Sequence, residues 1–271
     1  MKRVSIILPS YKPNFYIYDC IRSVCEQTLD ISLFELIIVL NGCDEPYYSN
    51  IDNYCSDIQK KPFIQIIQID EPGVSNARNI GMNVARGEYI CFLDDDDILS
   101  PTYIEKLLLG SSSSCVGLAN VKSFVKYIEE SNDDFFLSKY YRKRNLLKKK
   151  LYNFRGYFSV PVAKLIHKDL IGNIQYDTRL SNGEDSLFIT TLCLRITDFN
   201  FTEEDAIYYV RIRRGSASRQ KIKLKKLLYL LVHEEWEYIK LLYRNRETSK
   251  FFFFLSRIPG TLKSIWIMFR N

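Results

Sequence analysis

Apolar and polar residues alternate in blocks along the first hundred positions of the chain. Short apolar runs predict four strands, at Val4–Leu8, Phe34–Leu40, Phe63–Ile69 and Glu88–Leu93, and the first, rich in β-branched residues, is typical of a buried parallel strand. Apolar residues at helical spacing between these runs predict three helices, at Phe15–Gln27, Ile51–Ile58 and Gly73–Ala85. Strands and helices that alternate in this way are typical of an α/β fold with a mostly parallel sheet.

The pattern is less regular from Ser111 to Asn182. Further elements are predicted as strand-like runs at Val116–Ile128 and Tyr157–Val160, a helix at Gly183–Arg195 and a strand at Ala206–Ile212. Lys221–Tyr243 has the period of a long amphipathic helix. The aromatic-rich stretch Phe251–Phe269 follows it and is interrupted at Pro259-Gly260. We therefore predict one domain over residues 1–220 and an amphipathic helical segment over residues 221–271.

The composition is ordinary for a globular protein with a core, at 46% hydrophobic and 26% charged residues. The net charge of +6 is unevenly placed: residues 221–271 carry 11 Lys/Arg and 4 Glu, a net of +7. Residues 1–220 carry 27 basic and 28 acidic side chains, a net of −1. This asymmetry indicates an anionic partner for the C-terminal segment, such as a membrane surface or nucleic acid. Its aromatic groups flanked by Lys and Arg favour the membrane surface.

The cysteines and the hydropathy pattern indicate the cellular compartment of the protein. Seven Cys, an odd number without a C-x-x-C pair, indicate free thiols in a reducing cytosol. The start "MKRVSIILPSYK" has only a five-residue apolar run before Pro9, which is too short for a signal peptide. No uncharged apolar stretch reaches 18 residues, so we expect no spanning helix. We expect a cytoplasmic protein that associates peripherally with the inner face of the cytoplasmic membrane.

The segment "YICFLDDDD", Tyr89–Asp97, runs from a buried strand directly into four carboxylates. Such close carboxylates repel one another, and each then favours its protonated form. Asp94 and Asp96, separated by one residue, can share a hard divalent cation such as Mg²⁺ or Mn²⁺. A solvated acidic loop is the alternative. The position at a strand end of an α/β sheet, where ligands bind, favours the metal.

Two other motifs carry candidate chemistry. In "GVSNARNIG" (73–81), Arg78 and Asn79 lie near a predicted helix start, which suits phosphate oxygens; an N-cap with a surface Arg is the alternative. In "NGEDSLF" (182–188), Glu184 and Asp185 start a helix, which the helix dipole favours in any case; the functional interpretation is a general base. With only two His, "HEEWE" is not a zincin motif, and no P-loop, dinucleotide or nucleophile-elbow motif is present.

These pieces, in this order, resemble the family 2 glycosyltransferases with the GT-A fold. The resemblance rests on "VSIILPSYK" (4–12), "IIVLNG" (37–42), "GVSNARNIG" (73–81), "GEYICFLDDDD" (87–97) and "GEDSLF" (183–188). It implies a Rossmann-like, mostly parallel sheet flanked by helices, here with a C-terminal helical extension. Residues 1–105 would bind the nucleotide sugar and residues 106–220 the acceptor. It also implies a nucleotide-sugar donor, a Mn²⁺ or Mg²⁺ ion and inversion at the anomeric carbon.

The resemblance also assigns roles to single residues. Asp96 would hold the metal and Asp94 would contact the donor ribose, or the metal through water, with Asp95 and Asn79 beside the donor. Arg78 would face the base or the diphosphate, and Pro9 and Tyr11 would line the nucleotide pocket. Asp185 would be the catalytic base, with Glu184 holding acceptor or donor hydroxyls. Arg213 and Arg214, in "YYVRIRRGSASR" (208–219), would clamp the diphosphate, unless this is simply a basic hairpin tip.

One departure from the family is Leu40-Asn41-Gly42-Cys43, where relatives often have Asp-Asp-Gly-Ser. Asn41 can still hydrogen-bond a uracil, because its amide is both donor and acceptor. The basic segment Lys139–Lys150 is open to three interpretations: a solvated face, acceptor or membrane contact, and nucleic-acid binding.

The sequence therefore predicts an inverting hexosyl- or N-acetylhexosaminyltransferase that moves a sugar from a UDP-sugar to a hydroxyl of a glycan or lipid-linked oligosaccharide. We expect it to act in bacterial capsule or lipopolysaccharide synthesis and to bind an anionic membrane surface, but not nucleic acid. The alternatives are a non-catalytic nucleotide- or glycan-binding protein on the same fold and a basic nucleic-acid binder, whose binding would weaken steeply with salt.

Overall fold

The computed structural model describes residues 3–213, 224–244 and 250–258. The strands are β1 (Val4–Ser10), β2 (Phe34–Asn41), β3 (Phe63–Ile69), β4 (Tyr89–Phe92), β5 (Ile98–Leu99), β6 (Cys115–Leu118), β7 (Asn120–Phe124), β8 (Lys164–His167), β9 (Asp198–Phe201) and β10 (Ile207–Arg211). The α-helices are α1 (Tyr16–Cys25), α2 (Tyr47–Asp57), α3 (Val74–Val84), α4 (Tyr103–Leu109), α5 (Phe136–Arg142), α6 (Lys168–Ile171), α7 (Glu184–Leu192), α8 (Leu224–Arg244) and α9 (Phe251–Leu255). Short 3₁₀ turns lie at Ile128–Glu130, Leu151–Phe154 and Tyr157–Ser159.

The strands form a seven-stranded sheet in the order β3-β2-β1-β4-β8-β6-β9 and a three-stranded sheet in the order β5-β10-β7. The four strands β3, β2, β1 and β4 pair in parallel, with Val4 of β1 opposite both Phe34 of β2 and Tyr89 of β4. Every residue of β1, β2 and β4 is buried. Parallel strands covered on both faces require such continuous apolar runs, and this is why the sequence pattern located them.

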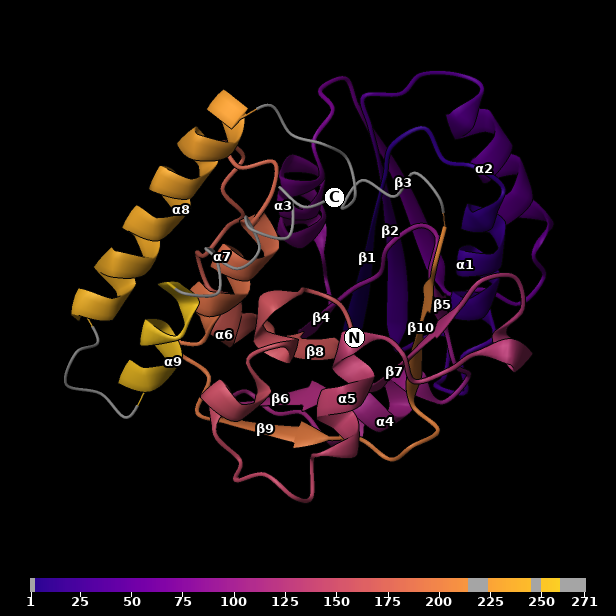
Figure 1. Cartoon of the computed structure of the whole chain (residues 1–271). Helices are drawn as coiled ribbons and strands as arrows, with labels where there is room; N and C mark the ends of the chain where they lie inside the picture. The colour runs from indigo at the N-terminus through magenta and orange to yellow at the C-terminus, as the bar shows by residue number, and fades with distance from the viewer. Residues whose placement is uncertain (1–2, 214–223, 245–249, 259–271) are drawn as a thin grey trace.

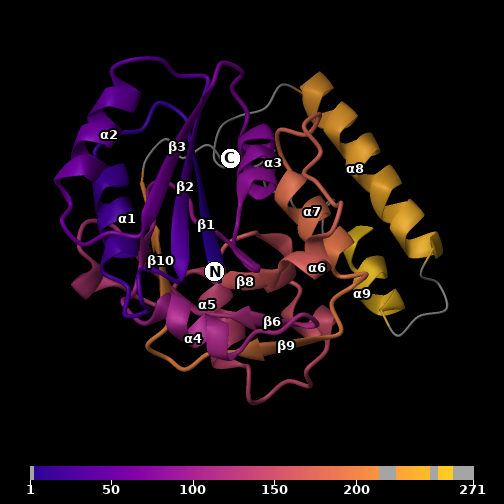
Figure 2. The ribbon, with the colours of Figure 1, turned by 180° about the vertical axis from the view of Figure 1, so that it is seen from behind.

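Helices cover both faces of the parallel half of the sheet. Figure 1 shows α1 and α2 on one face of β1–β3 and α3 on the other, and the reversed view in Figure 2 agrees. Helix α3 approaches β1 closely because Gly81 has no side chain: a Cβ atom there would lie 2.5 Å from Cγ2 of Ile7. The predicted α/β fold, with a mostly parallel central sheet flanked by helices, is confirmed.

The less regular middle of the chain shows where local pattern misled. The predicted strand at Tyr157–Val160 is wrong, since Tyr157–Ser159 is a 3₁₀ turn. Its rings are buried against the aromatic side chains of β9 instead of entering a ladder, because β6 already pairs with β8 and β9. The run Val116–Ile128 divides at Ala119 into β6 and β7, which belong to different sheets.

The C-terminal helices pack on the rest of the protein. Tyr238 and Leu241 of α8, and Phe253 and Phe254 of α9, belong to the same buried cluster as the strands of the large sheet. Arg257 donates to the hydroxyl of Ser159 over 2.6 Å and also to the carbonyl oxygen of Phe158. The predicted helices therefore exist over 224–244 and 251–255, while 221–223 and 259–269 lie outside the described residues.

Another part of the surface of α8 and α9 remains exposed and apolar. Its side chains are Val232, Trp236, Ile239 and Tyr243 of α8 and Phe252 and Leu255 of α9. On α8 these positions recur at helical spacing, so they form one stripe. We call these six residues the outer apolar stripe. Among the described residues, no helix combines the length and hydropathy needed to cross a bilayer.

The neighbouring residues Phe253 and Phe252 test this packing. Phe253 is 1% exposed and Phe252 is 67% exposed. Changing Phe253 to Ala should lower the free energy of unfolding by about 3–5 kcal/mol, because the change leaves a cavity in the core. Changing Phe252 to Ala should alter it by less than about 0.5 kcal/mol. Urea denaturation of the full chain measures both, and equal small losses would contradict the packing of α9 as core.

Candidate functional site

The candidate site lies at the carboxyl edge of the parallel strands, where β4 ends in the four carboxylates Asp94–Asp97. Helix α3 follows β3 and brings Arg78 to this edge, and α7 begins there with Glu184 and Asp185. Figures 1 and 2 show α3 and α7 as neighbours on one side of the sheet. The fold thus brings together segments that lie about a hundred residues apart in the sequence.

Arg78 joins the two carboxylate motifs. Its side chain is 4% exposed, and Nη1 donates to Oδ1 of Asp185 over 2.5 Å while Nη2 donates to Oδ1 of Asp94 over 3.2 Å. The guanidinium lies over the ring of Tyr176, at 5.2 Å from its centroid. Burial lowers the pKa of Arg78, but the neighbouring Asp185 and the other acidic groups outweigh burial and raise it above its ordinary value. Arg78 is therefore a permanent positive charge between the strand-end loop and α7.

The four carboxylates of the strand-end loop have different surroundings. Burial raises the pKa of Asp95 to about 6, against a hydrogen bond of 2.5 Å from the hydroxyl of Ser10. Burial and then the charge of Asp94 raise the pKa of Asp97 well above its usual value. Asp96 forms an ion pair with Nε of Arg213. The loop thus concentrates negative charge that its own protein cations balance only in part.

Arg211 is a site residue that the sequence interpretation missed. Its guanidinium lies between the rings of Tyr16 and Phe124, at 4.4 and 4.6 Å from their centroids. Nε donates to the carbonyl oxygen of Asp96 and the backbone N–H donates to Oδ1 of Asp97, both over 2.9 Å. Arg211 therefore fixes the backbone of the loop.

A sequence signal for Arg211 existed. Arg211 is the last residue of β10 and lies two residues before Arg213, which pairs with Asp96 just beyond the strand. Arg214 lies outside the described residues.

The side chains of the two asparagines predicted to contact the nucleotide form hydrogen bonds with the protein backbone. Asn41 is 3% exposed; its Nδ2 donates to the carbonyl oxygen of Ser10 over 2.8 Å and its Oδ1 accepts from the N–H of Gly73 over 2.9 Å. Asn79 exchanges two hydrogen bonds, of 3.0 and 2.8 Å, with the backbone of Tyr176. Asn41 thus ties β1 and β2 to the start of α3, and Asn79 holds Tyr176 beneath Arg78.

Pro9 and Tyr11 differ in exposure. Pro9 is buried within β1, opposite Val39 of β2, so it shapes the strand end without offering surface to a ligand. Tyr11 follows the strand and is 53% exposed. An exposed ring beside a strand-end loop can stack on a planar base.

Glu184 and Asp185 occupy the first turn of α7, after Gly183 in the left-handed region at φ 82°. The side chain of Asp185 is 32% exposed and is oriented by Arg78. Burial, and then the charge of Asp185, raise the pKa of Glu184 to about 7. Oε2 of Glu184 is buried and makes no hydrogen bond to the described residues.

The loop fits a divalent cation that takes further ligands from a substrate. The described part of the chain contains no cluster of three or more His, Cys, Asp or Glu side chains that would enclose a metal. The carboxylates of the loop offer oxygen ligands only, and burial raises the pKa of Asp95 to about 6. Mg²⁺ and Mn²⁺ suit such ligands, and Mg²⁺ is commonly held by one or two carboxylates plus substrate phosphates.

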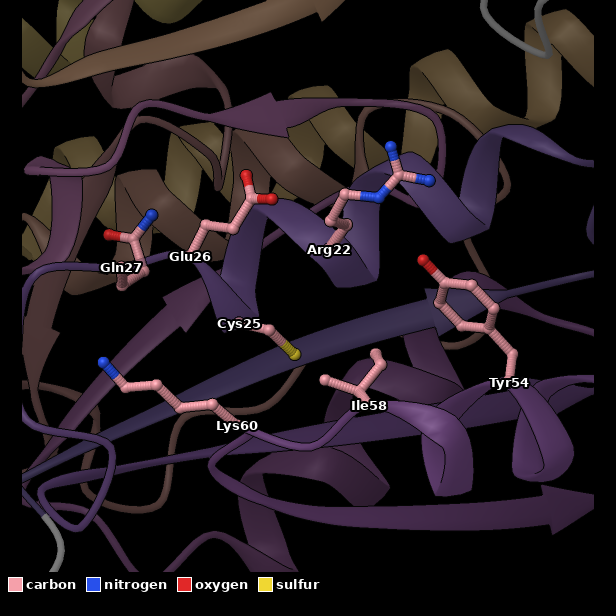
Figure 3. A pocket seen from close by; sticks show the side chains of 7 residues that line it. All are labelled: Arg22, Cys25, Glu26, Gln27, Tyr54, Ile58 and Lys60. Carbon is pink, nitrogen blue, oxygen red and sulfur yellow. The ribbon is translucent and has the colours of Figure 1, made fainter.

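A separate pocket of about 420 Å³ lies between α1 and α2 (Figure 3). Figure 3 shows its lining side chains Arg22, Cys25, Glu26, Gln27, Tyr54, Ile58 and Lys60. None of these is a predicted site residue. The Gln27 amide is already engaged, because Nε2 donates to the carbonyl oxygens of Ser23 and Ser100. This pocket is distinct from the carboxylate site.

Comparison with known proteins identifies one protein family. The model of the family described as glycosyl transferase family 2 matches residues 5–174. The minor teichoic acid biosynthesis protein GgaB of Bacillus subtilis is 27% identical over 82% of this chain, which spans only 24% of GgaB. The poly(ribitol-phosphate) beta-N-acetylglucosaminyltransferase TarP of Staphylococcus aureus is 24% identical over 80% of this chain and 65% of its own length.

The solved structures show the same fold. The crystal structure of S. aureus TarS 1–349 in complex with UDP-GlcNAc aligns with a TM-score of 0.65 at 20% identity, over 92% of this chain and 74% of that chain. At this identity the likeness concerns the architecture, and it supports the GT-A fold that the motifs predicted.

Proposed function

Because this chain belongs to glycosyl transferase family 2, we propose that it transfers a sugar from a UDP-sugar to an acceptor hydroxyl with inversion at the anomeric carbon. The observation that carries this proposal is the Arg78 guanidinium, which links Asp94 of the strand-end loop to Asp185 at the start of α7. One carboxylate group beside a donor and another beside an acceptor are what a single-displacement transfer requires. Their common contact places both within one site.

In the proposed reaction, the Asp185 carboxylate takes the proton of the acceptor hydroxyl as its oxygen attacks the anomeric carbon. The bond between that carbon and the β-phosphate oxygen breaks, and UDP leaves from the opposite face. A positioned base contributes roughly 10²–10⁴-fold. Arg78 and Arg213 provide fixed positive charge toward the diphosphate, and preorganised charge of this kind is usually the largest catalytic contribution.

The metal belongs to this proposal as well. Asp96 would hold a Mn²⁺ or Mg²⁺ ion, with Asp94 and Asp95 beside it. When bound, the ion supplies positive charge that stabilises the leaving diphosphate. Arg211 keeps the carbonyl of Asp96 in place, so the carboxylate of Asp96 projects from a fixed turn. Tyr11, with its exposed ring, is the proposed stacking partner of the uracil.

The relatives narrow the proposed substrates. The names of TarP and GgaB refer to an N-acetylglucosaminyl group, a poly(ribitol-phosphate) and teichoic acid. A UDP-N-acetylhexosamine donor is therefore our first choice, with a hexosyl donor as the alternative. The proposed acceptor is a hydroxyl of a surface glycan or polyol-phosphate polymer, carried on lipid as in capsule or lipopolysaccharide synthesis.

Membrane association is the last part of the proposal. The outer apolar stripe lies on the two helices of the basic C-terminal segment. Apolar and aromatic groups with nearby Lys and Arg suit the headgroup region of a bilayer, and each basic residue near an anionic surface contributes about 1 kcal/mol. This arrangement would seat the protein on the inner membrane face, beside a lipid-linked acceptor.

The metal assignment predicts that UDP binding depends on Asp96. Changing Asp96 to Ala removes the proposed ligand, so UDP affinity in Mn²⁺ should fall at least tenfold and should then resemble that of the native protein in EDTA. Calorimetry measures both. Asp44, an exposed carboxylate after β2, is the matched control, and its change to Ala should leave affinity unaltered. Equal UDP affinity of the native protein in Mn²⁺ and in EDTA would contradict the metal assignment.

The base assignment predicts a loss of turnover without a loss of UDP affinity. We expect Asp185→Asn to lower the rate of UDP release from a reactive UDP-sugar, found by a panel screen, by about 10²-fold or more. Glu184→Gln should cost less, because Glu184 is assigned to hydroxyl contacts. If Glu184→Gln is the more damaging change, the residue with the pKa of about 7 is the base. UDP binding without turnover of any nucleotide sugar would favour the non-catalytic alternative.

The membrane proposal predicts flotation with anionic vesicles. The test requires the full chain, because removing residues after 219 would also remove Tyr238 and Phe253 from the core. The native protein should float with phosphatidylglycerol vesicles at low salt, and the double change Trp236→Ser, Ile239→Ser should reduce the floating fraction severalfold. Leu109→Ser, on an apolar residue of α4 that is even more exposed than Trp236, is the control. No flotation of the native protein would end this part of the proposal.

A further inference from the structure

Helix α8 makes polar contacts with the first turn of α7, which carries the proposed base. The hydroxyl of Tyr238 lies 2.7 Å from the hydroxyl of Ser186, the residue that follows Asp185. The same Tyr238 hydroxyl donates to Oε1 of Glu234 over 2.8 Å. Tyr238 is 1% exposed and Glu234 is 8% exposed. A buried chain of three hydrogen-bonding groups thus joins α8 to the first turn of α7.

A second contact lies on the other side of the same turn. Nε2 of His233 is 2.9 Å from Oδ2 of Asp177, and Asp177 follows Tyr176, on which Arg78 lies. His233 and Tyr238 therefore hold both flanks of the segment 178–185. Neither contact touches the acidic pair directly, so their effect on it is through the position of the backbone.

Gly183 makes the fit between the turn and α8 close. Its φ of 82° favours glycine, and a Cβ atom added there would collide with the carboxylate of Glu234. The absent side chain therefore leaves room for Glu234 next to the backbone that begins α7. The Tyr238 hydroxyl, which donates to Oε1 of Glu234, holds this carboxylate against the backbone of Gly183.

We propose that α8 forms part of the catalytic centre, with Glu234 and Tyr238 as positioning residues that fix Glu184 and Asp185 through Gly183 and Ser186. This inference rests on the proposed function for its effect on turnover, but its structural content can be measured without turnover. Under this proposal, α8 positions the acidic pair in addition to the membrane contact proposed above.

The effect of the Glu234 charge on the pKa of Glu184 can be measured directly. The charged groups that face Glu184 are Asp185 of its own helix, Arg78 of α3 and Glu234 of α8. Burial and then Asp185 raise the pKa of Glu184 most, Glu234 raises it further, and Arg78 lowers it. Replacing Glu234 by the neutral Gln removes a raising charge, so the pKa of Glu184 should fall.

The kinetic arm compares Glu234→Gln and Tyr238→Phe with the control Glu237→Gln. Glu237 lies on the same helix and pairs with Lys240 over 2.6 Å. We expect the first two variants to lower kcat for UDP release about tenfold, with KM for the UDP-sugar within about twofold, because misplacement of a catalytic group by a fraction of an ångström costs rate more than binding. The control should match the native protein.

The spectroscopic arm follows Glu184 in protein labelled with ¹³C at glutamate carboxyl groups, with the resonance assigned through Glu184→Gln. Its titration midpoint should fall in Glu234→Gln and stay in place in Glu237→Gln. If the native protein turns over no nucleotide sugar, the proposed function fails and this titration alone decides the inference. An unchanged midpoint in Glu234→Gln, or kcat values of both variants equal to the control, would overturn it.

Discussion

The site depends on one buried cation. Arg78 is nearly inaccessible to solvent, yet it contacts two carboxylates from distant parts of the chain, Asp94 and Asp185. A buried charge is tolerated only when it is paired and hydrogen-bonded, so the loop after β4 and the start of α7 must meet at Arg78. Asn79 and Tyr176 complete the support, since the amide of Asn79 holds the backbone of the residue whose ring lies under the guanidinium.

The same constraint explains why a buried strand ends in four carboxylates. Each of them relies on a different partner: Arg78 for Asp94, the Ser10 hydroxyl for Asp95, Arg213 for Asp96 and a backbone N–H for Asp97. Only two of these partners carry a charge. Burial, and to a lesser extent the neighbouring carboxylates, raise the pKa values of Asp95 and Asp97, and a bound cation would favour the ionised carboxylates. This surplus of negative charge is the physical basis of the metal site that we propose.

The sequence predicted those parts of the molecule that local pattern controls. Strands buried on both faces require apolar runs, so β1, β2 and β4 and the carboxylates that follow β4 could be predicted directly from the sequence. The 3₁₀ turn at Tyr157–Ser159, where the pattern predicts a strand, could not be predicted, because it depends on which strands already pair with one another. Likewise, Asn41 and Asn79 have the chemistry of ligand contacts, and only the fold reveals that the backbone uses both ends of each amide.

Helix α8 shows how far an amphipathic pattern can be interpreted. The periodicity defines two faces, but it does not say what each face meets. In the structure, Tyr238 and Leu241 join the core, Glu234 meets the turn before α7, and Trp236 and Ile239 remain exposed. Helix α8 is buried on one side and exposed and apolar on the other. It cannot be removed without disturbing the core, because Tyr238 on its buried side belongs to the core and contacts Ser186 of α7. On the two proposals made for α8, contact of its exposed side with a membrane would involve the same helix that positions the first turn of α7.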